Sequence, residues 1–86
     1  MAEHILSYSH TVVAPHGVRY RVSVHGERNE LGTWNGWLVF RPESGDEPVL
    51  RTDRETTQPA RDDLEYWASG LEPVYLDGAF GRASPA

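Results

Sequence analysis

The stretch Val18–His25, with sequence VRYRVSVH, alternates apolar and polar residues and carries the clearest structural signal in the chain. Successive side chains of a β-strand point to opposite faces of a sheet, so this alternation predicts a strand with one covered face and one face in water. A covered face needs a second layer of structure. We therefore expect a two-layer domain.

The second half of the chain offers helices for that layer. A helix is expected over 60–69, because its apolar residues fall at spacings of three and four and form one stripe: Leu64, Trp67, Ala68 and Leu71. A second helix is expected over 73–83. Gly78 and Gly81 disfavour this helix, and the run VYL would also suit a strand.

The remaining apolar runs complete the predicted sheet. Strands are expected near 5–13, 18–25, 37–41 and 49–54. The 86 residues make one domain, with residues 83–86 expected as a frayed tail. The predicted fold class is α+β, with an antiparallel sheet of about four strands followed by one or two C-terminal helices.

Turn residues set the expected connections. Pro15 and Gly17 predict a type I turn over 14–17, and a two-residue loop there would place Val13 opposite Val18. The pair Asn35-Gly36 predicts a bend that closes an irregular stretch over 26–35. Before the first helix, one of three polar residues is expected to cap the helix start: Thr56, Thr57 or Gln58. Gly70 is expected to end the helix in the left-handed conformation.

The alternation assigns side chains to two unlike sheet faces. The covered face is predicted to hold Val13, Val18, Tyr20, Val22, Val24, Leu38, Phe40 and Leu50. The opposite face is predicted to hold Tyr8, His10, Arg19, Arg21, Ser23, His25, Trp37, Arg41, Arg51 and Asp53. Arginine beside aromatic residues is typical of an interaction surface, although an ordinary wet face with arginine stems lying on rings gives the same pattern.

Charge and composition restrict the classes of function. The net charge is −5, all eight basic residues are arginine, and cysteine is absent. An acidic chain is a poor binder of generic DNA or RNA, so no nucleic-acid partner is expected. Without cysteine there is no disulfide framework, thiolate metal site or cysteine nucleophile. The N-terminus has no signal-peptide pattern and no run is long enough for a membrane span, which predicts a soluble cytoplasmic protein. Because the core of so short a chain is small, a homodimer is one alternative, and a monomer that folds alone is the other.

No catalytic or metal motif stands out. The four histidines, His4, His10, His16 and His25, have no HxxxH or HExxH spacing, so no metal site is predicted. A Gly-x-Ser-x-Gly elbow and a phosphate-binding glycine loop are both missing. We therefore predict no cofactor and no catalytic residues, and the sequence favours a non-catalytic protein while leaving a small enzyme as the alternative.

Two hypotheses for function follow. The first is a non-catalytic binding or accessory module that engages protein through an Arg/Trp sheet face, with Arg19, Arg21 and Trp37 as its candidate residues. The alternative is a small enzyme or a protein that binds an anion or small ligand at the 51–58 segment, whose candidate residues are Arg51, Arg54, Thr56, Thr57 and Gln58. Binding of single-stranded nucleic acid by stacking on the sheet is a weaker third hypothesis. A deep pocket at the 51–58 segment would favour the alternative, and a flat Arg/Trp face would favour the module.

Overall fold

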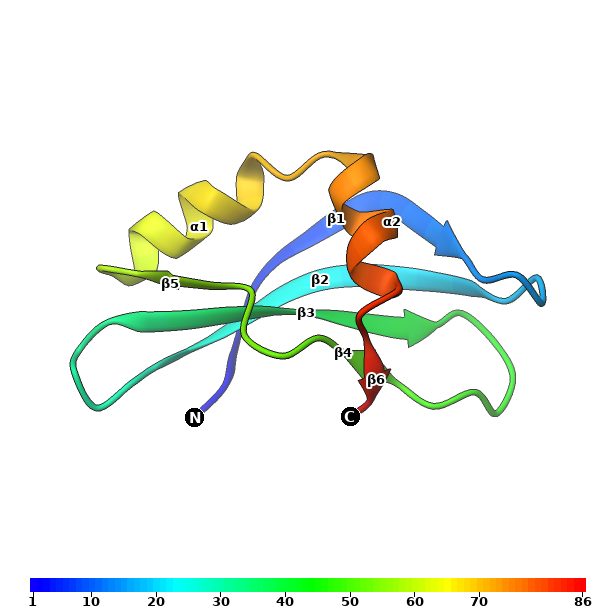
Figure 1. The fold of residues 1–86 in the computed structure, drawn as a ribbon, viewed down its shortest axis with the longest axis horizontal. Coiled ribbons are helices and arrows are strands. Elements are labelled where there is room, and N and C mark those ends of the chain that lie inside the picture. Colours follow the sequence, from blue (N-terminus) through cyan, green and yellow to red (C-terminus); the bar gives the residue numbers. More distant parts are fainter.

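The computed structural model describes residues 1–86, which form a six-stranded antiparallel sheet covered on one side by two helices (Figure 1). The long strands are β1 (Glu3–Val13), β2 (Arg19–Arg28) and β3 (Trp34–Pro42). The short strands are β4 (Leu50–Arg51), β5 (Thr56–Gln58) and β6 (Ser84–Pro85). The sheet order is β1-β2-β3-β4-β6, and β5 pairs with the other end of β3. The predicted α+β class is confirmed, but the strand expected over 49–54 is reduced to the two residues of β4.

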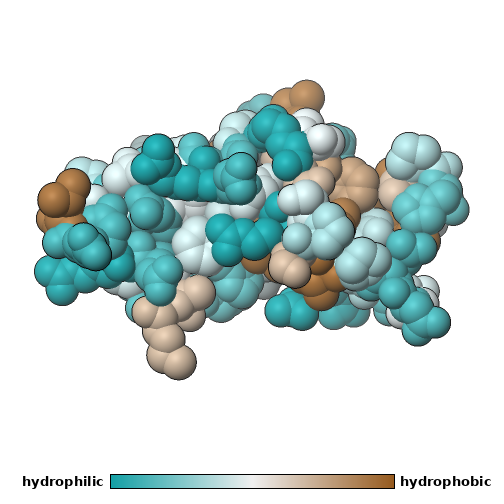
Figure 2. Space-filling view, turned by 60° about the horizontal axis from the view of Figure 1, so that its bottom comes forward, coloured by the Kyte–Doolittle hydropathy of each residue, from teal (hydrophilic) through white to brown (hydrophobic).

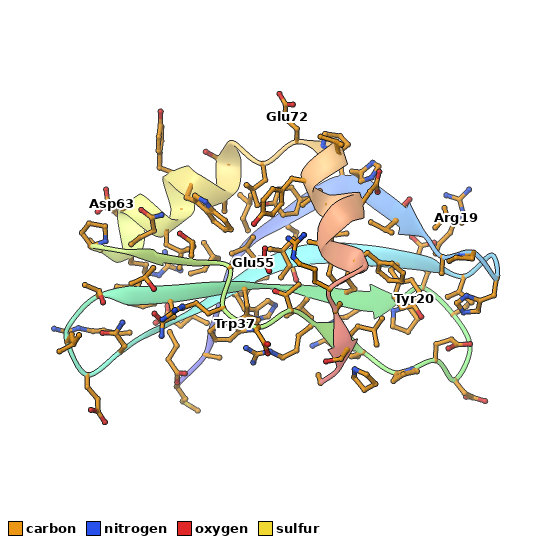
Figure 3. The ribbon with its side chains drawn as sticks, viewed as in Figure 1. Arg19, Tyr20, Trp37, Glu55, Asp63 and Glu72 are labelled. Atoms are coloured by element: carbon orange, nitrogen blue, oxygen red, sulfur yellow. The ribbon has the colours of Figure 1, made fainter.

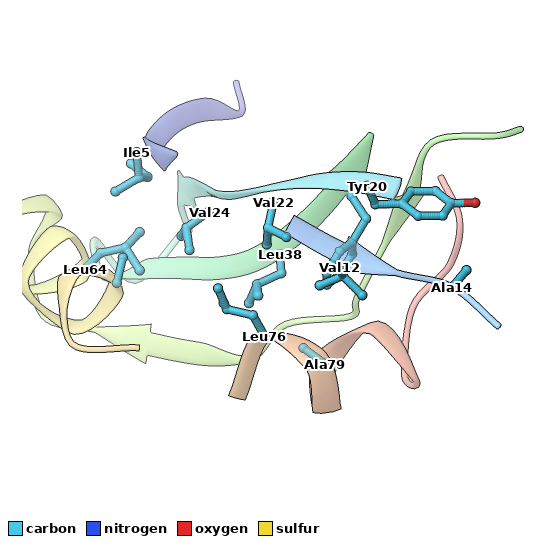
Figure 4. Packing of buried hydrophobic residues seen from close by; sticks show 12 residues of the cluster. Ile5, Val12, Ala14, Tyr20, Val22, Val24, Leu38, Leu64, Leu76 and Ala79 are labelled. Carbon is cyan, nitrogen blue, oxygen red and sulfur yellow. The ribbon is translucent and has the colours of Figure 1, made fainter. Parts of the chain in front are cut away.

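Both predicted helices are present: α1 (Arg61–Ser69) and α2 (Pro73–Phe80). α1 buries Leu64 and Ala68, and α2 buries Leu76 and Ala79. These side chains meet the apolar face of the sheet in one core (Figure 4). The predicted stripe of the first helix therefore contains both buried positions of α1.

The expected helix cap and helix end are wrong. The N-cap of α1 is Ala60, and no side chain bonds to its free N–H groups. Thr56–Gln58 instead pair with Trp34–Gly36 as β5, which keeps these residues extended and ahead of the helix start. At the other end Gly70 has φ −91°, which is right-handed and not left-handed.

Two glycines without side chains leave a notch in the sheet surface where α1 packs. Gly26 and Gly36 lie opposite each other on β2 and β3. A Cβ atom at Gly26 would lie 2.4 Å from Leu64 Cδ2, and one at Gly36 would lie 2.5 Å from Leu64 Cδ1. Leu64 thus occupies the space that two side chains would take, and α1 approaches the sheet more closely than a fully substituted pair of strands allows.

The predicted bend at Asn35-Gly36 is wrong, because both residues lie inside β3. β2 and β3 instead form a hairpin whose loop is residues 29–33. Asn29 organises this loop: its Oδ1 accepts hydrogen bonds from the backbone N–H groups of Leu31 and Thr33, at 3.0 and 3.2 Å. Gly32, with φ +83°, supplies the left-handed residue that closes it. Gly36 is needed for the notch and not for a turn.

The register of β1 differs by one residue from the predicted one. Val13 lies opposite Arg19 and Val12 opposite Tyr20, where Val13 was expected opposite Val18. The turn begins as predicted, with Gly17 N donating to Ala14 O at 2.8 Å, but Gly17 has φ +92° and adds a third residue to the loop. A slip of one residue exchanges the two faces of a strand. Val12 is therefore buried, and Val13 is 54% exposed.

The same shift corrects two residues of the predicted cationic face. Tyr8 and His10 lie on the helix side: Tyr8 OH donates a 2.6 Å hydrogen bond to Ala68 O in α1, and His10 Nε2 lies 2.9 Å from Asp77 Oδ1 in α2. The C-terminus differs as well, since Ala86 N donates to Val49 O at 2.9 Å and Ser84–Pro85 pair with β4. The terminal residues are paired with the sheet where a frayed tail was expected.

Candidate functional site

The sheet face turned away from the helices, called the open face here, carries most of the candidate residues. β2 contributes Arg19, Arg21, Ser23 and His25, which alternate with the buried residues of that strand. The register places Trp37, Val39 and Arg41 of β3 and Arg51 of β4 on the same face, although Trp37 and Val39 are themselves buried. Figure 2 brings the side away from the helices forward, and hydrophilic residues cover most of it. The predicted cationic face is therefore formed without Tyr8 and His10, and without Asp53, which lies beyond the end of β4 and outside the sheet.

Trp37 is the buried part of the open face. Its side chain is only 7% exposed, because the guanidinium of Arg51 lies over the indole ring at 4.2 Å and Arg51 Nε is held by the carbonyl of Thr52 at 3.1 Å. A cation over an aromatic face is attractive, and the arginine stem shields the ring from water. Trp37 and Arg51 thus stabilise each other, and little of the ring is left to contact a partner.

Beside this closed region, the open face has a hollow of about 550 Å³ over β1, β2 and the end of β3. Small hydroxyl side chains line part of it, namely Ser7, Ser9 and Thr11 on β1 and Ser23 on β2. Larger side chains stand around them, namely His4, Arg21, His25, Arg41 and Glu43. The hollow therefore lies where short side chains of the bulged strand β1 meet longer side chains of β2 and of the end of β3.

Two arginines dominate the charge of this hollow. Arg21 and Arg41 lie directly opposite each other on β2 and β3. Arg21 is 78% exposed and has one distant carboxylate, Glu43 Oε2 at 3.8 Å from its Nε, while Arg41 forms no ion pair or hydrogen bond. Since Glu43 is the single carboxylate among the lining residues, the hollow has an excess of positive charge, and the two arginines repel each other across the strands.

Two histidine–serine pairs line the hollow. His4 Nε2 lies 2.7 Å from Ser7 Oγ, His25 Nε2 lies 3.1 Å from Ser23 Oγ, and the two rings meet edge to face at 5.5 Å. Burial, followed by the nearby His4, Arg41 and Arg51, lowers the pKa of His25, which keeps its ring neutral near pH 7. Neither ring has a carboxylate within 4 Å to orient it as a base, so the geometry suits hydrogen bonding better than nucleophilic catalysis.

The 51–58 segment, the second predicted site, uses its polar side chains within the protein. Thr57 Oγ1 donates to Asn35 Oδ1 at 3.0 Å, and Gln58 Nε2 donates to Thr56 Oγ1 at 2.7 Å. Arg54 is exposed, and no pocket includes any residue of the segment. The structure does not bring Arg54 near Arg51, Thr56 or Gln58 in a shared hollow.

Glu55 explains part of the polarity of this segment. Its side chain is 10% exposed and accepts hydrogen bonds from Tyr75 OH and Arg82 Nη2, both at 2.6 Å. Burial alone would raise the pKa of Glu55, but the bonds from Arg82 and Tyr75 outweigh it and hold the pKa below its usual range. Burial and the bond to Glu55 raise the pKa of Tyr75 to about 12. Figure 3 shows Glu55 beside α2, where it ties the segment to the C-terminal part of the chain.

The helix layer has the opposite charge to the hollow. The exposed acidic residues of the helices and their connection are Asp62, Asp63, Glu65, Glu72 and Asp77. Figure 3 shows Asp63 and Glu72 projecting outward on the side away from the sheet. The net charge of −5 therefore hides an uneven distribution: two arginines and one carboxylate line the hollow, whereas the helices and their connection carry five exposed carboxylates and one arginine, Arg61.

Sequence reasoning missed the β1 side of the hollow. His4, Ser7, Ser9 and Thr11 were not among the candidate site residues, and Arg41 was placed only on the face. The alternation Ser-Tyr-Ser-His-Thr over 7–11 is the signal that could have found them, once β1 is in its true register. The structure groups no three histidine, cysteine or acidic side chains in a geometry that could hold a metal ion.

Comparisons with protein-family models, with curated proteins and with solved structures find no match to this chain. At nine and eight residues, neither helix is long and apolar enough to cross a membrane.

Proposed function

We propose that this protein is a small non-catalytic binding module that engages an acidic partner protein through its open face. The observation that carries the proposal is the pair Arg21 and Arg41, which face each other over the hollow with a single carboxylate 3.8 Å from one of them. Arginine forks bind carboxylate and phosphate oxygens with two parallel hydrogen bonds. An acidic group of the partner in the hollow would offset the repulsion between Arg21 and Arg41.

The uneven charge of the molecule supports an acidic partner. Complementary charge speeds the encounter of two proteins and fixes their orientation, while like charge rejects the wrong approach. The acidic helix layer, which includes Asp63 and Glu72, would repel such a partner and leave the open face as the favoured side. Arg19, exposed at the start of β2, extends the cationic surface.

The alternative, an anion or small-ligand site or a small enzyme at the 51–58 segment, is the weaker proposal. Thr57, Gln58 and Glu55 already satisfy their hydrogen bonds within the protein, and Arg51 stacks on Trp37. A homodimer and a cytoplasmic location stay predictions. A dimer contact centred on Trp37 has little support, because 7% of that side chain is exposed in the single chain.

The proposal is tested by affinity capture from the source cells with matched charge variants. The wild-type chain and the control Arg28→Glu should retain one partner, which should then bind the purified chain directly, whereas the double variant Arg21→Glu/Arg41→Glu should lose it. Arg28 is exposed at the far end of β2 and lies outside the hollow, so the control changes charge without changing the site. Equal capture by the wild type and the double variant would refute the proposal.

A further inference from the structure

The opposed arginines of the hollow point to the kind of group that binds there. Arg21 and Arg41 are paired across β2 and β3, and like charges directly opposite each other on a sheet are destabilising. Within the protein, Glu43 lies 3.8 Å from Arg21, and Arg41 has no counter-charge. A ligand that needs both guanidinium groups would carry about two negative charges.

Hydroxyl side chains that line the hollow add uncharged hydrogen-bond donors. The hydroxyl groups of Ser9 and Thr11 line it and make no hydrogen bond within the protein. A hydroxyl can turn to donate to an oxygen above it. The two hydrophobic residues of the lining, Tyr8 and Val22, turn their side chains to the helix side, so the lining side chains of the open face are polar or charged. The ligand group is therefore small, dianionic and rich in oxygen.

The geometry points to the hollow as a receptor site for a phosphate monoester, held as its dianion between Arg21 and Arg41 with Ser9 and Thr11 donating to its remaining oxygens. This inference rests on the proposed binding function of the open face. A monoester has three terminal oxygens and a charge near −2 at neutral pH. It can accept paired hydrogen bonds from two guanidinium groups and a further hydrogen bond from the hydroxyl group of Ser9 or Thr11.

Other anions match the hollow less well. A carboxylate has two coplanar oxygens and one charge, which a single arginine fork satisfies. A phosphodiester carries one charge and continues as a chain on both sides, and the net charge of −5 opposes a polyanion. The monoester could be borne by a phosphorylated side chain of the partner or by a free phosphate ester, and these two sources share the same group.

The test is a titration of the ¹⁵N-labelled full chain followed by NMR chemical shifts. The probes are phosphoserine, a phosphoserine peptide, the same peptide with glutamate in place of phosphoserine, dimethyl phosphate and acetate. With phosphoserine we expect saturable chemical-shift changes on β1, β2 and β3 around the hollow. The apparent affinity for acetate and for dimethyl phosphate should be about tenfold or more lower than that for phosphoserine. Tighter binding of the phosphopeptide than of free phosphoserine would assign a protein source, and equal binding a free ester.

Single variants make the test specific. Arg21→Gln and Arg41→Gln should each weaken phosphoserine binding about tenfold or more, whereas Arg28→Gln, which removes the same charge elsewhere on β2, should leave it unchanged. If Arg41→Gln fails to fold, Arg41→Lys keeps the charge and removes the fork, and should still weaken binding.

The outcomes separate the inference from the proposed function. Binding of the glutamate peptide at the open face, dependent on Arg21, without stronger binding of the phosphopeptide would overturn the phosphate inference and keep the acidic partner. Equal affinity for phosphoserine and dimethyl phosphate, or shifts confined to residues 51–58, would also overturn it. Absence of binding by every probe, together with failure of the capture experiment, would refute both.

Discussion

The two faces of the β2–β3 hairpin come from the same strands, yet they differ in almost every physical respect. On the helix side Val22, Val24, Leu38 and Phe40 are at most 2% exposed, and Leu64 enters a notch with no space left over. On the open side Arg21 and Arg41 stand in water around a hollow of about 550 Å³. The helix side is closely packed, whereas the open side has an arginine without an ion pair, Arg41, and a solvent-filled hollow.

This difference follows from the two-residue period of the strands, which places the residues that stabilise the fold on one face and the candidate site residues on the other. Over residues 19–26 of β2, a change at an even-numbered position alters the core and a change at an odd-numbered position alters the open face, whereas Arg28 at the strand end is exposed. Variants on the helix side should therefore change the free energy of unfolding and leave binding intact. Variants around the hollow should do the reverse.

The largest effect is expected at the notch. Leu64 is fully buried, so Leu64→Ala should lower the free energy of unfolding by about 2–5 kcal/mol through lost burial and the cavity left behind. Chemical denaturation measures this loss, with Tyr66→Ala as the control on the same helix, since Tyr66 is 82% exposed. A neutral Leu64→Ala would mean that α1 does not hold the sheet.

A double-mutant cycle sharpens the same point. Gly36→Ala should cost about 1–3 kcal/mol in the wild type, because the new Cβ would lie 2.5 Å from Leu64 Cδ1. In the Leu64→Ala background that cost should fall, since the opposing methyl group is gone. Equal costs in both backgrounds would show that Gly36 is kept for some reason other than the notch.

The next effect concerns Glu55. Its folded pKa is depressed from the usual 4.5, so its stabilising contribution is fully present above about pH 4.5 and is lost as the pH falls through the lower folded value. Glu55→Gln should cost about 1–2 kcal/mol near pH 7, discounted because Arg82 is half exposed. The difference between wild type and variant should shrink in denaturation curves below pH 4.5, and a pH-independent difference would contradict the ion-pair explanation.

A smaller effect is expected where Arg51 covers Trp37 on the open face. Arg51→Ala removes the guanidinium that lies 4.2 Å from the Trp37 ring centre and should cost about 0.5–1 kcal/mol. Thermal unfolding with Arg41→Ala as the control measures it, because Arg41 stacks on no ring. Greater loss from Arg41→Ala than from Arg51→Ala would reverse the assignment of structural and free arginines.

The smallest effect is a gain. Ala60 is the N-cap of α1 with an extended backbone and no side-chain cap, so Ala60→Ser should bond a free N–H group and add about 0.5 kcal/mol of stability. Denaturant midpoints should rise while ligand binding stays constant. A loss of stability would indicate that the helix start is already satisfied by another group.

Much of the fold could be predicted from the sequence, because local period sets which side of an element is buried. The alternation over 18–25 identified the buried side of β2, and the spacing of Leu64 and Ala68 identified that of α1. Both signals depend on residues within one element. They require no knowledge of how elements meet.

The errors arose where distant residues decide the local structure. Asn35-Gly36 resembles a turn, but Gly36 serves the notch for Leu64, a residue 28 positions away, and Asn29 closes the hairpin instead. The phase of β1 depended on one residue of loop length, which the left-handed Gly17 supplies. Because that phase was wrong, Ser7, Ser9 and Thr11 were left off the open face, and the hollow could not be predicted.

The most direct test of the division between the two faces is the stability of the double variant Arg21→Gln/Arg41→Gln. If these arginines are kept for binding, removing their repulsion should leave the free energy of unfolding unchanged or raise it by up to about 1 kcal/mol, while binding at the hollow is lost. Chemical denaturation of this variant beside Arg28→Gln measures the change. A loss of more than about 1 kcal/mol would show that the opposed arginines hold the fold together, and would contradict their role as a binding site.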